Sequence, residues 1–136
     1  MKKIYFVIFI AFSASMLSAC TEKFISEIEL AVNDTRINIS WRQAQNQLDF
    51  VYPIYSTGTW TIDIVAGGDW LSIDRNSGSG TQYVNCTATA NTTDRPRVVK
   101  LEIKGAGKTI YTYVVTSSQD ISAADLDNAD LHNYLY

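Results

Sequence analysis

The sequence predicts an all-β protein, an antiparallel immunoglobulin-like β-sandwich of about seven or eight strands. Two observations carry this prediction. Apolar and polar residues alternate with a period of two along most of the chain, and short segments rich in turn-forming residues separate the alternating runs. No long segment before residue 120 has the helical period. A chain of 136 residues, 46% of them hydrophobic, can bury the core of one such domain.

Each predicted strand is a run in which every second residue is apolar and in which β-branched and aromatic residues are frequent. In chain order the runs are 28–32, 37–41, 48–54, 60–64, 84–90, 99–103 and 109–116. The turns expected between strands are 33–34, 56–58, 67–68, 77–80, 94–96 and 105–107. Glycines in these turns adopt backbone angles that other residues resist, so the chain can reverse direction there.

The phase of the alternation also predicts which side chains face the core. Trp41 has the same phase as the apolar residues of the run 37–41, and Trp60 has the inward phase of the run 60–64. Both are therefore expected to be buried. Cys86 lies at an inward position among other apolar residues, so we expect a buried and unreactive thiol.

The first residues of the chain have the pattern of a signal peptide. Lys2 and Lys3 give a positive start, and residues 4–12 form an apolar run that is too short to span a membrane. Cleavage would remove both lysines and leave a more acidic mature protein. The sequence therefore divides into a signal peptide, 1–19, a lipidated tether, 20–26, a β-sandwich, 27–119, and a C-terminal tail, 120–136.

The signal peptide ends in Leu17, Ser18, Ala19 and Cys20. This tetrapeptide resembles the lipobox of bacterial lipoproteins, in which a dedicated peptidase recognises the first three residues and cleaves before the cysteine. The resemblance implies that Cys20 is the lipid attachment site and carries diacylglycerol and a further acyl chain such as palmitate. Several acyl chains anchor a protein firmly where one is marginal. We therefore expect a lipoprotein, and the family that the second half of the chain resembles implies the cell outer membrane, on a face that the sequence leaves open.

The composition argues against several classes of function. The net charge is −3 and the pI is about 5.0, which leaves no basic surface for nucleic acid. His132 is the only histidine, so we expect no catalytic residues, no metal and no cofactor. A sandwich of this size has little room for a groove with the paired carboxylates of a glycosidase, although four carboxylates are available, Asp63, Asp69, Asp74 and Glu102. We therefore expect that the protein is not an enzyme.

The composition changes at residue 120. Ser122 and Asp125 form a weak helix-start signal, but acidic and amide residues interrupt any broad apolar face. The acidic residues lack the glycine and the glutamate that an EF-hand calcium loop requires. We expect an acidic tail that is flexible or forms a short helix.

A series of short sequence motifs occurs in order along the second half of the chain. They are Trp60, the segment Asp69-Trp70-Leu71-Ser72-Ile73, the turn Ser77-Gly78-Ser79-Gly80, the strand 84–88, Asn91 and Arg95. In this order, residues 60–119 resemble a BACON domain, a small β-sandwich found in many Bacteroidetes surface proteins. The resemblance implies that Trp60 and Trp70 pack in the core. Two features depart from the family pattern, namely Pro96-Arg97 in place of a glycine and an unusually aromatic last strand.

The resemblance implies a non-catalytic carbohydrate-binding module that works beside glycan-degrading enzymes. A glycan, an outer-membrane transporter and a glycan-degrading enzyme are then the expected partners. Sugars stack on exposed aromatic rings, and the candidates for this role are Tyr111 and Tyr113 on one face of a strand and Tyr83 on another strand. The alternative is a structural spacer or protein-interaction accessory of an outer-membrane complex that binds no sugar.

Overall fold

The computed structural model describes residues 29–135. The predicted signal peptide, the lipobox with Cys20, and the tether therefore lie outside the described residues. The strands are β1 (Leu30–Val32), β2 (Arg36–Ile39), β3 (Leu48–Ser56), β4 (Thr59–Gly67), β5 (Leu71–Ile73), β6 (Ser77–Ser79), β7 (Gln82–Ala88), β8 (Arg97–Gly105) and β9 (Lys108–Thr116). The short helices are α2 (Trp41–Ala44), η1 (Ala123–Asp125), α3 (Asn128–Leu131) and η2 (His132–Tyr134). Within residues 29–135, no helix is long and apolar enough to cross a membrane.

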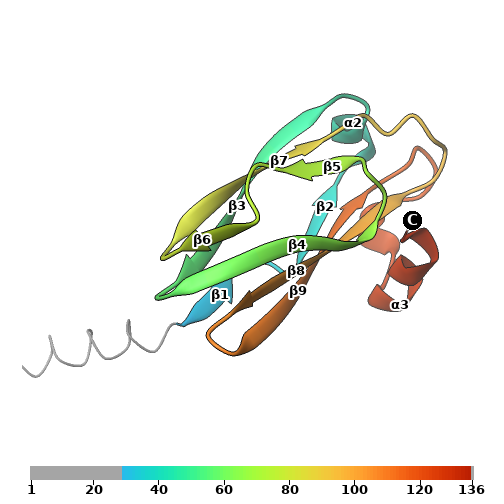
Figure 1. Cartoon of the computed structure of the whole chain (residues 1–136). Helices are drawn as coiled ribbons and strands as arrows, with labels where there is room; N and C mark the ends of the chain where they lie inside the picture. Colours follow the sequence, from blue (N-terminus) through green and yellow to red (C-terminus); the bar gives the residue numbers. More distant parts are fainter. Residues whose placement is uncertain (1–28, 136) are drawn as a thin grey trace, which may run out of the picture.

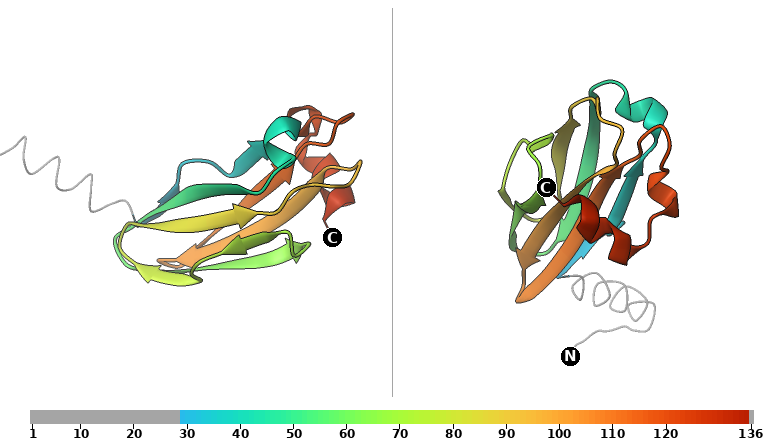
Figure 2. Two further views of the ribbon diagram at one scale, coloured as in Figure 1. Left: turned by 90° about the horizontal axis from the view of Figure 1, so that it is seen from above. Right: turned by 90° about the vertical axis from the view of Figure 1, so that its right-hand side faces the viewer.

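The strands form two sheets that pack face to face, which confirms the predicted β-sandwich (Figure 1, Figure 2). One sheet has four strands in the order β1-β3-β7-β5, and the other has five in the order β2-β9-β8-β4-β6. This arrangement has the strand order of an immunoglobulin-like sandwich. Alternation did not predict β5 and β6, because each is only three residues long.

One strand pair differs from the antiparallel arrangement that the sequence predicts. The residues of β2 pair with β9 in parallel, with Arg36 opposite Tyr113 and Ile39 opposite Thr116. The reason is that the chain passes from one sheet to the other between β1 and β2 without reversing its direction (Figure 1). The five-stranded sheet is therefore mixed, while the four-stranded sheet is antiparallel throughout.

The core lies between the two sheets and consists of the inward-facing residues that the alternation predicts. Trp60, Trp70 and Cys86 are all buried, as expected. Burial raises the pKa of the Cys86 thiol to about 12, so this thiol stays protonated at neutral pH. The large side chains that are almost completely buried include Leu30, Ile54, Ile62, Val84, Leu101, Ile103 and Val114.

Trp41 is not a buried strand residue, contrary to the sequence prediction. The strand β2 ends at Ile39, and Trp41 is the half-buried first residue of α2. The cause is a capping box, in which the Ser40 hydroxyl accepts a hydrogen bond from the Gln43 backbone N–H and the Gln43 side chain accepts one from the Ser40 N–H. These two hydrogen bonds satisfy backbone N–H groups at the start of the helix that would otherwise lack a partner. A helix therefore begins at Trp41, although the alternation of the sequence would extend the strand to this residue.

A second departure from the alternation occurs in β4. Ile64 has the inward phase of Trp60 and Ile62, yet 37% of its surface is exposed. The register between β4 and β8 shifts between Ile64 and Ala66, which marks a β-bulge. Ile64 still pairs with the buried Leu101 and lies directly before the bulge, whereas the extra residue moves Ala66 opposite Lys100, on the outer face of the sheet.

The C-terminal segment (residues 120–135) is packed on the domain, whereas the sequence analysis allowed a flexible tail or a short helix. The short helices are present, and they cover one end of the outer face of the five-stranded sheet (Figure 2). Leu131 and Ala123 are buried against Val98 and Val115. The apolar residues of this segment do not follow one helical period, because they lie on three separate short helices and on the residues beside them. The partly buried members of this cluster are Tyr113, Leu126, Tyr134 and Leu135.

Candidate functional site

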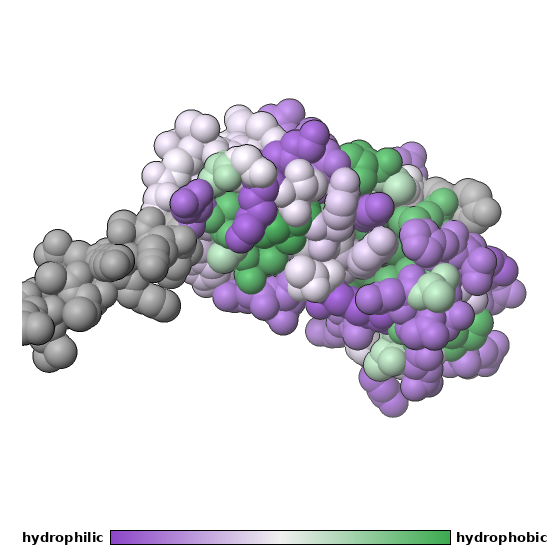
Figure 3. Space-filling view, turned by 90° about the horizontal axis from the view of Figure 1, so that it is seen from below, coloured by the Kyte–Doolittle hydropathy of each residue, from purple (hydrophilic) through white to green (hydrophobic). Residues whose placement is uncertain are grey.

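Two of the three predicted ligand-binding tyrosines lie on the outer face of the five-stranded sheet. Tyr111 and Tyr113 project from β9 toward Glu102 and Lys100, which are their cross-strand partners on β8. We call these four residues the tyrosine face. Tyr111 is 44% exposed, whereas Tyr113 is half-buried beside the C-terminal segment. Figure 3 shows the molecule from below, with hydrophilic and weakly polar residues making up most of the surface and apolar patches between them.

Charged groups fix the position of the Tyr111 ring. The Lys100 ammonium lies over it, with Nζ 4.4 Å from the ring centroid, and is 6.0 Å from the centroid of Tyr113. The Tyr111 hydroxyl donates a hydrogen bond of 3.1 Å to Glu102 Oε2. On the other side, Glu102 Oε1 is 3.5 Å from Lys104 Nζ. The result is an exposed aromatic ring with a hydroxyl, a carboxylate and two ammonium groups beside it.

This arrangement can bind a ligand that offers both hydroxyl groups and a flat C–H face. The carboxylate accepts hydrogen bonds from hydroxyl groups, and the ammonium groups donate them. However, Lys100 occupies one face of the Tyr111 ring, so only the remaining ring surface is open to stacking. The tyrosine face thus has the chemistry of a shallow saccharide site and no enclosed groove.

Tyr83 lies on a different surface from the other two candidate tyrosines. It projects from β7 on the outer face of the four-stranded sheet, opposite Pro53 of β3, and is 59% exposed. Val51, two residues along β3, is also exposed. The structure therefore brings Tyr111 and Tyr113 together but separates them from Tyr83 by the whole thickness of the sandwich.

The contacts of Trp60 and Trp70 are those of buried core residues. The Trp60 indole N–H donates a hydrogen bond of 2.8 Å to the Gly80 carbonyl. The Trp70 ring packs under the Arg97 guanidinium, whose carbon is 4.5 Å from the ring centroid. The Trp70 indole N–H is buried and has no hydrogen-bond partner among residues 29–135. Neither ring offers a face on which a sugar could stack.

The side chains of Tyr52 and Asp74 have shifted pKa values, which bear on whether either could act as an acid or a base. Burial raises the pKa of the Tyr52 hydroxyl to about 12, and this hydroxyl lies 2.7 Å from Thr112 Oγ1 in a buried contact between the sheets. Hydrogen bonds from Asn85 lower the pKa of the Asp74 carboxyl, which is the wrong direction for a general acid. Within the described part of the chain, no group of three or more histidine, cysteine, aspartate or glutamate side chains is placed to hold a metal ion.

The sequence prediction did not place Lys100 and Glu102 of β8 beside the tyrosines, although Glu102 was named as an available carboxylate and a signal for the pairing exists. The turn between β8 and β9 consists of Ala106 and Gly107, both of which have positive φ angles, as in a two-residue type I′ hairpin. Such a turn fixes the register of the whole hairpin. Counting back from it places Glu102 opposite Tyr111 and Lys100 opposite Tyr113.

The fold and the exposed side chains together define a small immunoglobulin-like β-sandwich module. Residues 58–120 match the family model "BACON: Putative binding domain, N-terminal". The predicted resemblance to the BACON domain is therefore confirmed over this segment, which holds both tryptophans of the core and the complete tyrosine face.

One solved structure that shows the same fold is the Bacteroides ovatus GH5 xyloglucanase in complex with a XXXG heptasaccharide, with 22% sequence identity and a TM-score of 0.56 over 66% of this chain. The chain corresponds to only 19% of that enzyme's length. The PapD-like domain 7 of human CEP192 is more distant, with 9% identity and a TM-score of 0.47 over 87% of this chain and 96% of that one. No curated protein matches the chain.

Proposed function

We propose that this protein is a non-catalytic, lipid-anchored module of the cell envelope that binds a glycan through its tyrosine face. The observation that carries the proposal is the position of exposed Tyr111 beside Glu102 and Lys100, within a segment that matches a family of binding domains. An aromatic ring with neighbouring hydrogen-bonding groups is a common way to hold a sugar. The similarity to part of a xyloglucanase supports a role beside glycan-degrading enzymes.

Replacement of Tyr111 by alanine tests the glycan proposal directly. We expect the soluble chain from residue 21 onward to bind at least one glycan on a broad array, and Tyr111→Ala to weaken that binding roughly fivefold, because stacking contributes about 1 kcal/mol. Tyr83→Ala is the matched control, since it removes a tyrosine that is more exposed than Tyr111 and lies on the opposite sheet. Tyr113 is less suitable, because its ring also packs against the C-terminal segment. Equal binding by Tyr111→Ala and the wild type would contradict the proposed site.

The anchor belongs to the proposal because Cys20 ends a lipobox-like tetrapeptide after a signal-peptide pattern. We expect cells that express the wild type to incorporate a palmitate analogue into the protein, and cells that express Cys20→Ala not to do so. Cys86→Ala is the control, because it removes the other cysteine, which is buried. Equal labelling of the wild type and Cys20→Ala would show that the lipid anchor is wrong.

A second function is favoured by the four-stranded sheet. Its outer face exposes the apolar side chain of Val51 and the aromatic side chain of Tyr83, which are 54% and 59% exposed. Such a surface fits a structural spacer or an accessory subunit that contacts an outer-membrane transporter or a glycan-degrading enzyme. Failure of the wild type to bind any glycan, together with co-purification of such a partner that is lost in Tyr83→Ala, would favour this function.

A further inference from the structure

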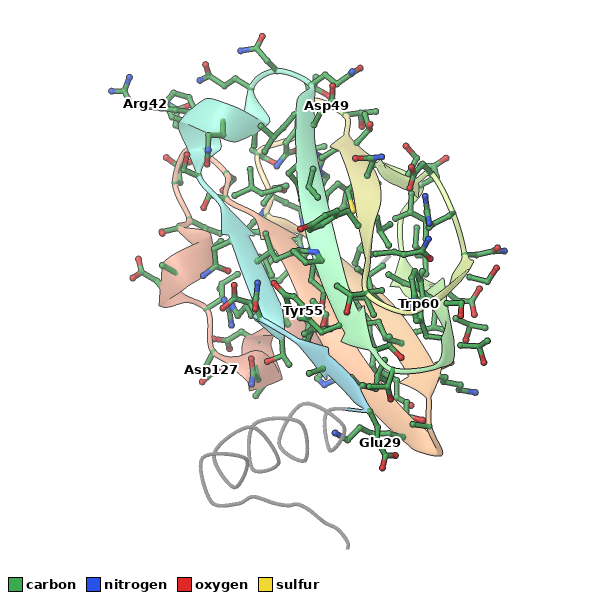
Figure 4. The ribbon with its side chains drawn as sticks, turned by 90° about the vertical axis from the view of Figure 1, so that its left-hand side faces the viewer. Glu29, Arg42, Asp49, Tyr55, Trp60 and Asp127 are labelled. Atoms are coloured by element: carbon green, nitrogen blue, oxygen red, sulfur yellow. The ribbon has the colours of Figure 1, made fainter. Side chains whose placement is uncertain are left out.

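A hollow of about 380 Å³, lined mostly by serine, amide and aspartate residues, lies between α2 and the start of the C-terminal segment. Figure 4 shows these two elements, marked by Arg42 and Asp127, on the same side of the molecule. Trp41 lines the hollow from α2, and Asn38 lines it from the end of β2. The opposite wall contains Gln119, Asp120 and Asp125. The hollow is therefore a different surface from the tyrosine face.

Hydrogen bonds fix the two walls of the hollow relative to each other. The Ser117 backbone N–H donates to the Ile39 carbonyl over 2.8 Å, which joins the end of β9 to the end of β2. The buried Ser117 hydroxyl accepts a bond of 2.6 Å from the Ala123 N–H. The buried Ser118 then closes the turn, because its N–H donates to the Ile121 carbonyl and its hydroxyl accepts from the Ile121 N–H. The walls are thus held in place before any ligand arrives.

The serine hydroxyls and the Asn38 amide oxygen of the hollow already accept hydrogen bonds, whereas four other lining groups are available to a ligand. Among residues 29–135, the Trp41 indole N–H, the Gln119 amide, and the carboxylates of Asp120 and Asp125 form no hydrogen bond and no ion pair. By contrast, the Ser40 side chain is fully used in the capping box of α2. The hollow thus combines one half-buried indole ring with several unused acceptors and donors from amides and carboxylates.

From these features we infer that the hollow is a second glycan site, which binds a neutral saccharide unit against the Trp41 ring. An indole ring gives a sugar an apolar face, while amides and carboxylates accept and donate the hydrogen bonds of its hydroxyl groups. The described residues that line the hollow include no lysine or arginine, and two aspartates repel an anionic sugar. The volume lies within the range of small-molecule sites. This inference rests on the proposed glycan function and adds the site and the charge of the ligand.

Nuclear magnetic resonance of the soluble chain from residue 21 onward can test this inference. The protein has three tryptophan indole signals, and Trp41→Phe identifies the one from Trp41. We expect this signal to shift on titration with at least one of cellohexaose, xylohexaose and mannohexaose, and not with the anionic hexagalacturonate. Trp41→Ala should weaken that binding at least tenfold. Arg42→Ala is the matched control, because Arg42 is an exposed neighbour on α2 that does not line the hollow.

A second variant keeps the test decisive even if Trp41→Ala perturbs α2. Asp120→Asn keeps the size of an exposed side chain and one of its acceptor oxygens, replaces the other oxygen by an amide donor, and removes the charge. It should reduce the discrimination against hexagalacturonate and leave the spectrum of the core unchanged.

The outcomes separate this inference from the proposed function. An unshifted Trp41 signal with every neutral hexasaccharide at millimolar concentration would overturn the second site, and glycan binding lost in Tyr111→Ala would then still support the tyrosine face. A shift of the Trp41 signal with normal binding by Tyr111→Ala would support the hollow and contradict the tyrosine face. Hexagalacturonate binding at Trp41 as tight as that of the neutral sugars would also overturn the inference.

Discussion

Trp60→Ala is expected to lower the free energy of unfolding by about 3–5 kcal/mol, because it removes a large aromatic side chain from the centre of the core. Only 2% of Trp60 is exposed, and Gly78 packs directly on its ring. The substitution would also leave the Gly80 carbonyl without the indole donor. Urea denaturation followed by far-ultraviolet circular dichroism measures the loss without depending on tryptophan fluorescence.

Two further variants show whether the loss comes from burial. Trp60→Phe keeps much of the aromatic volume and removes the hydrogen bond to Gly80, so it should cost clearly less than Trp60→Ala. Tyr83→Ala removes an exposed aromatic ring and should change stability by no more than about 0.5 kcal/mol. A midpoint for Trp60→Ala close to that of the wild type would mean that Trp60 does not stabilise the core.

Gly67→Ala is expected to have the second largest effect, a loss of roughly 2–4 kcal/mol. Gly67 ends β4 after the bulge and has a φ angle of 110°, which L side chains rarely adopt. A β-carbon at this position would lie 2.5 Å from the Val98 carbonyl oxygen and 2.8 Å from the Val99 α-carbon. Both are backbone atoms of β8, so the strand itself would have to move.

Gly58→Ala is the matched control for this prediction. A β-carbon on Gly58 would have no atom within 4 Å, so this variant should be nearly as stable as the wild type. Thermal unfolding of the two variants under identical conditions compares them directly. Equal melting temperatures for Gly67→Ala and Gly58→Ala would show that the close approach of β4 and β8 at Gly67 does not limit stability.

The sequence by itself determined the class of fold, because the period of two is a local property. A strand that buries one face must alternate wherever it ends up, so Tyr52, Val84 and Leu101 were recognisable as core residues without any knowledge of the sheets. The resemblance to the BACON domain was equally readable, since the order of its motifs lies in the chain itself. The pairing of β8 with β9, which builds the tyrosine face, could also have been predicted, because a two-residue turn fixes the register of the hairpin.

The tertiary structure decided how these strands share their surfaces. No local pattern predicts that β7 joins the four-stranded sheet and β9 the five-stranded sheet. This assignment of strands to sheets places Tyr83 on the opposite face of the sandwich from Tyr111. Likewise, the parallel pairing of β2 with β9 depends on where the chain changes sheets. Both features arise from contacts between residues far apart in the sequence, which alternation along one strand cannot specify.

The clearest case of tertiary control is the C-terminal segment. Its composition resembles that of a solvated tail, because its acidic residues interrupt every helical apolar face. In the folded chain, the separate helices η1 and α3 bring Ala123 and Leu131 onto Val98 and Val115. The same packing places Asp120 and Asp125 across the hollow from Trp41. The burial of these side chains requires a surface supplied by β8 and β9, so only the assembled sheet determines where the segment lies.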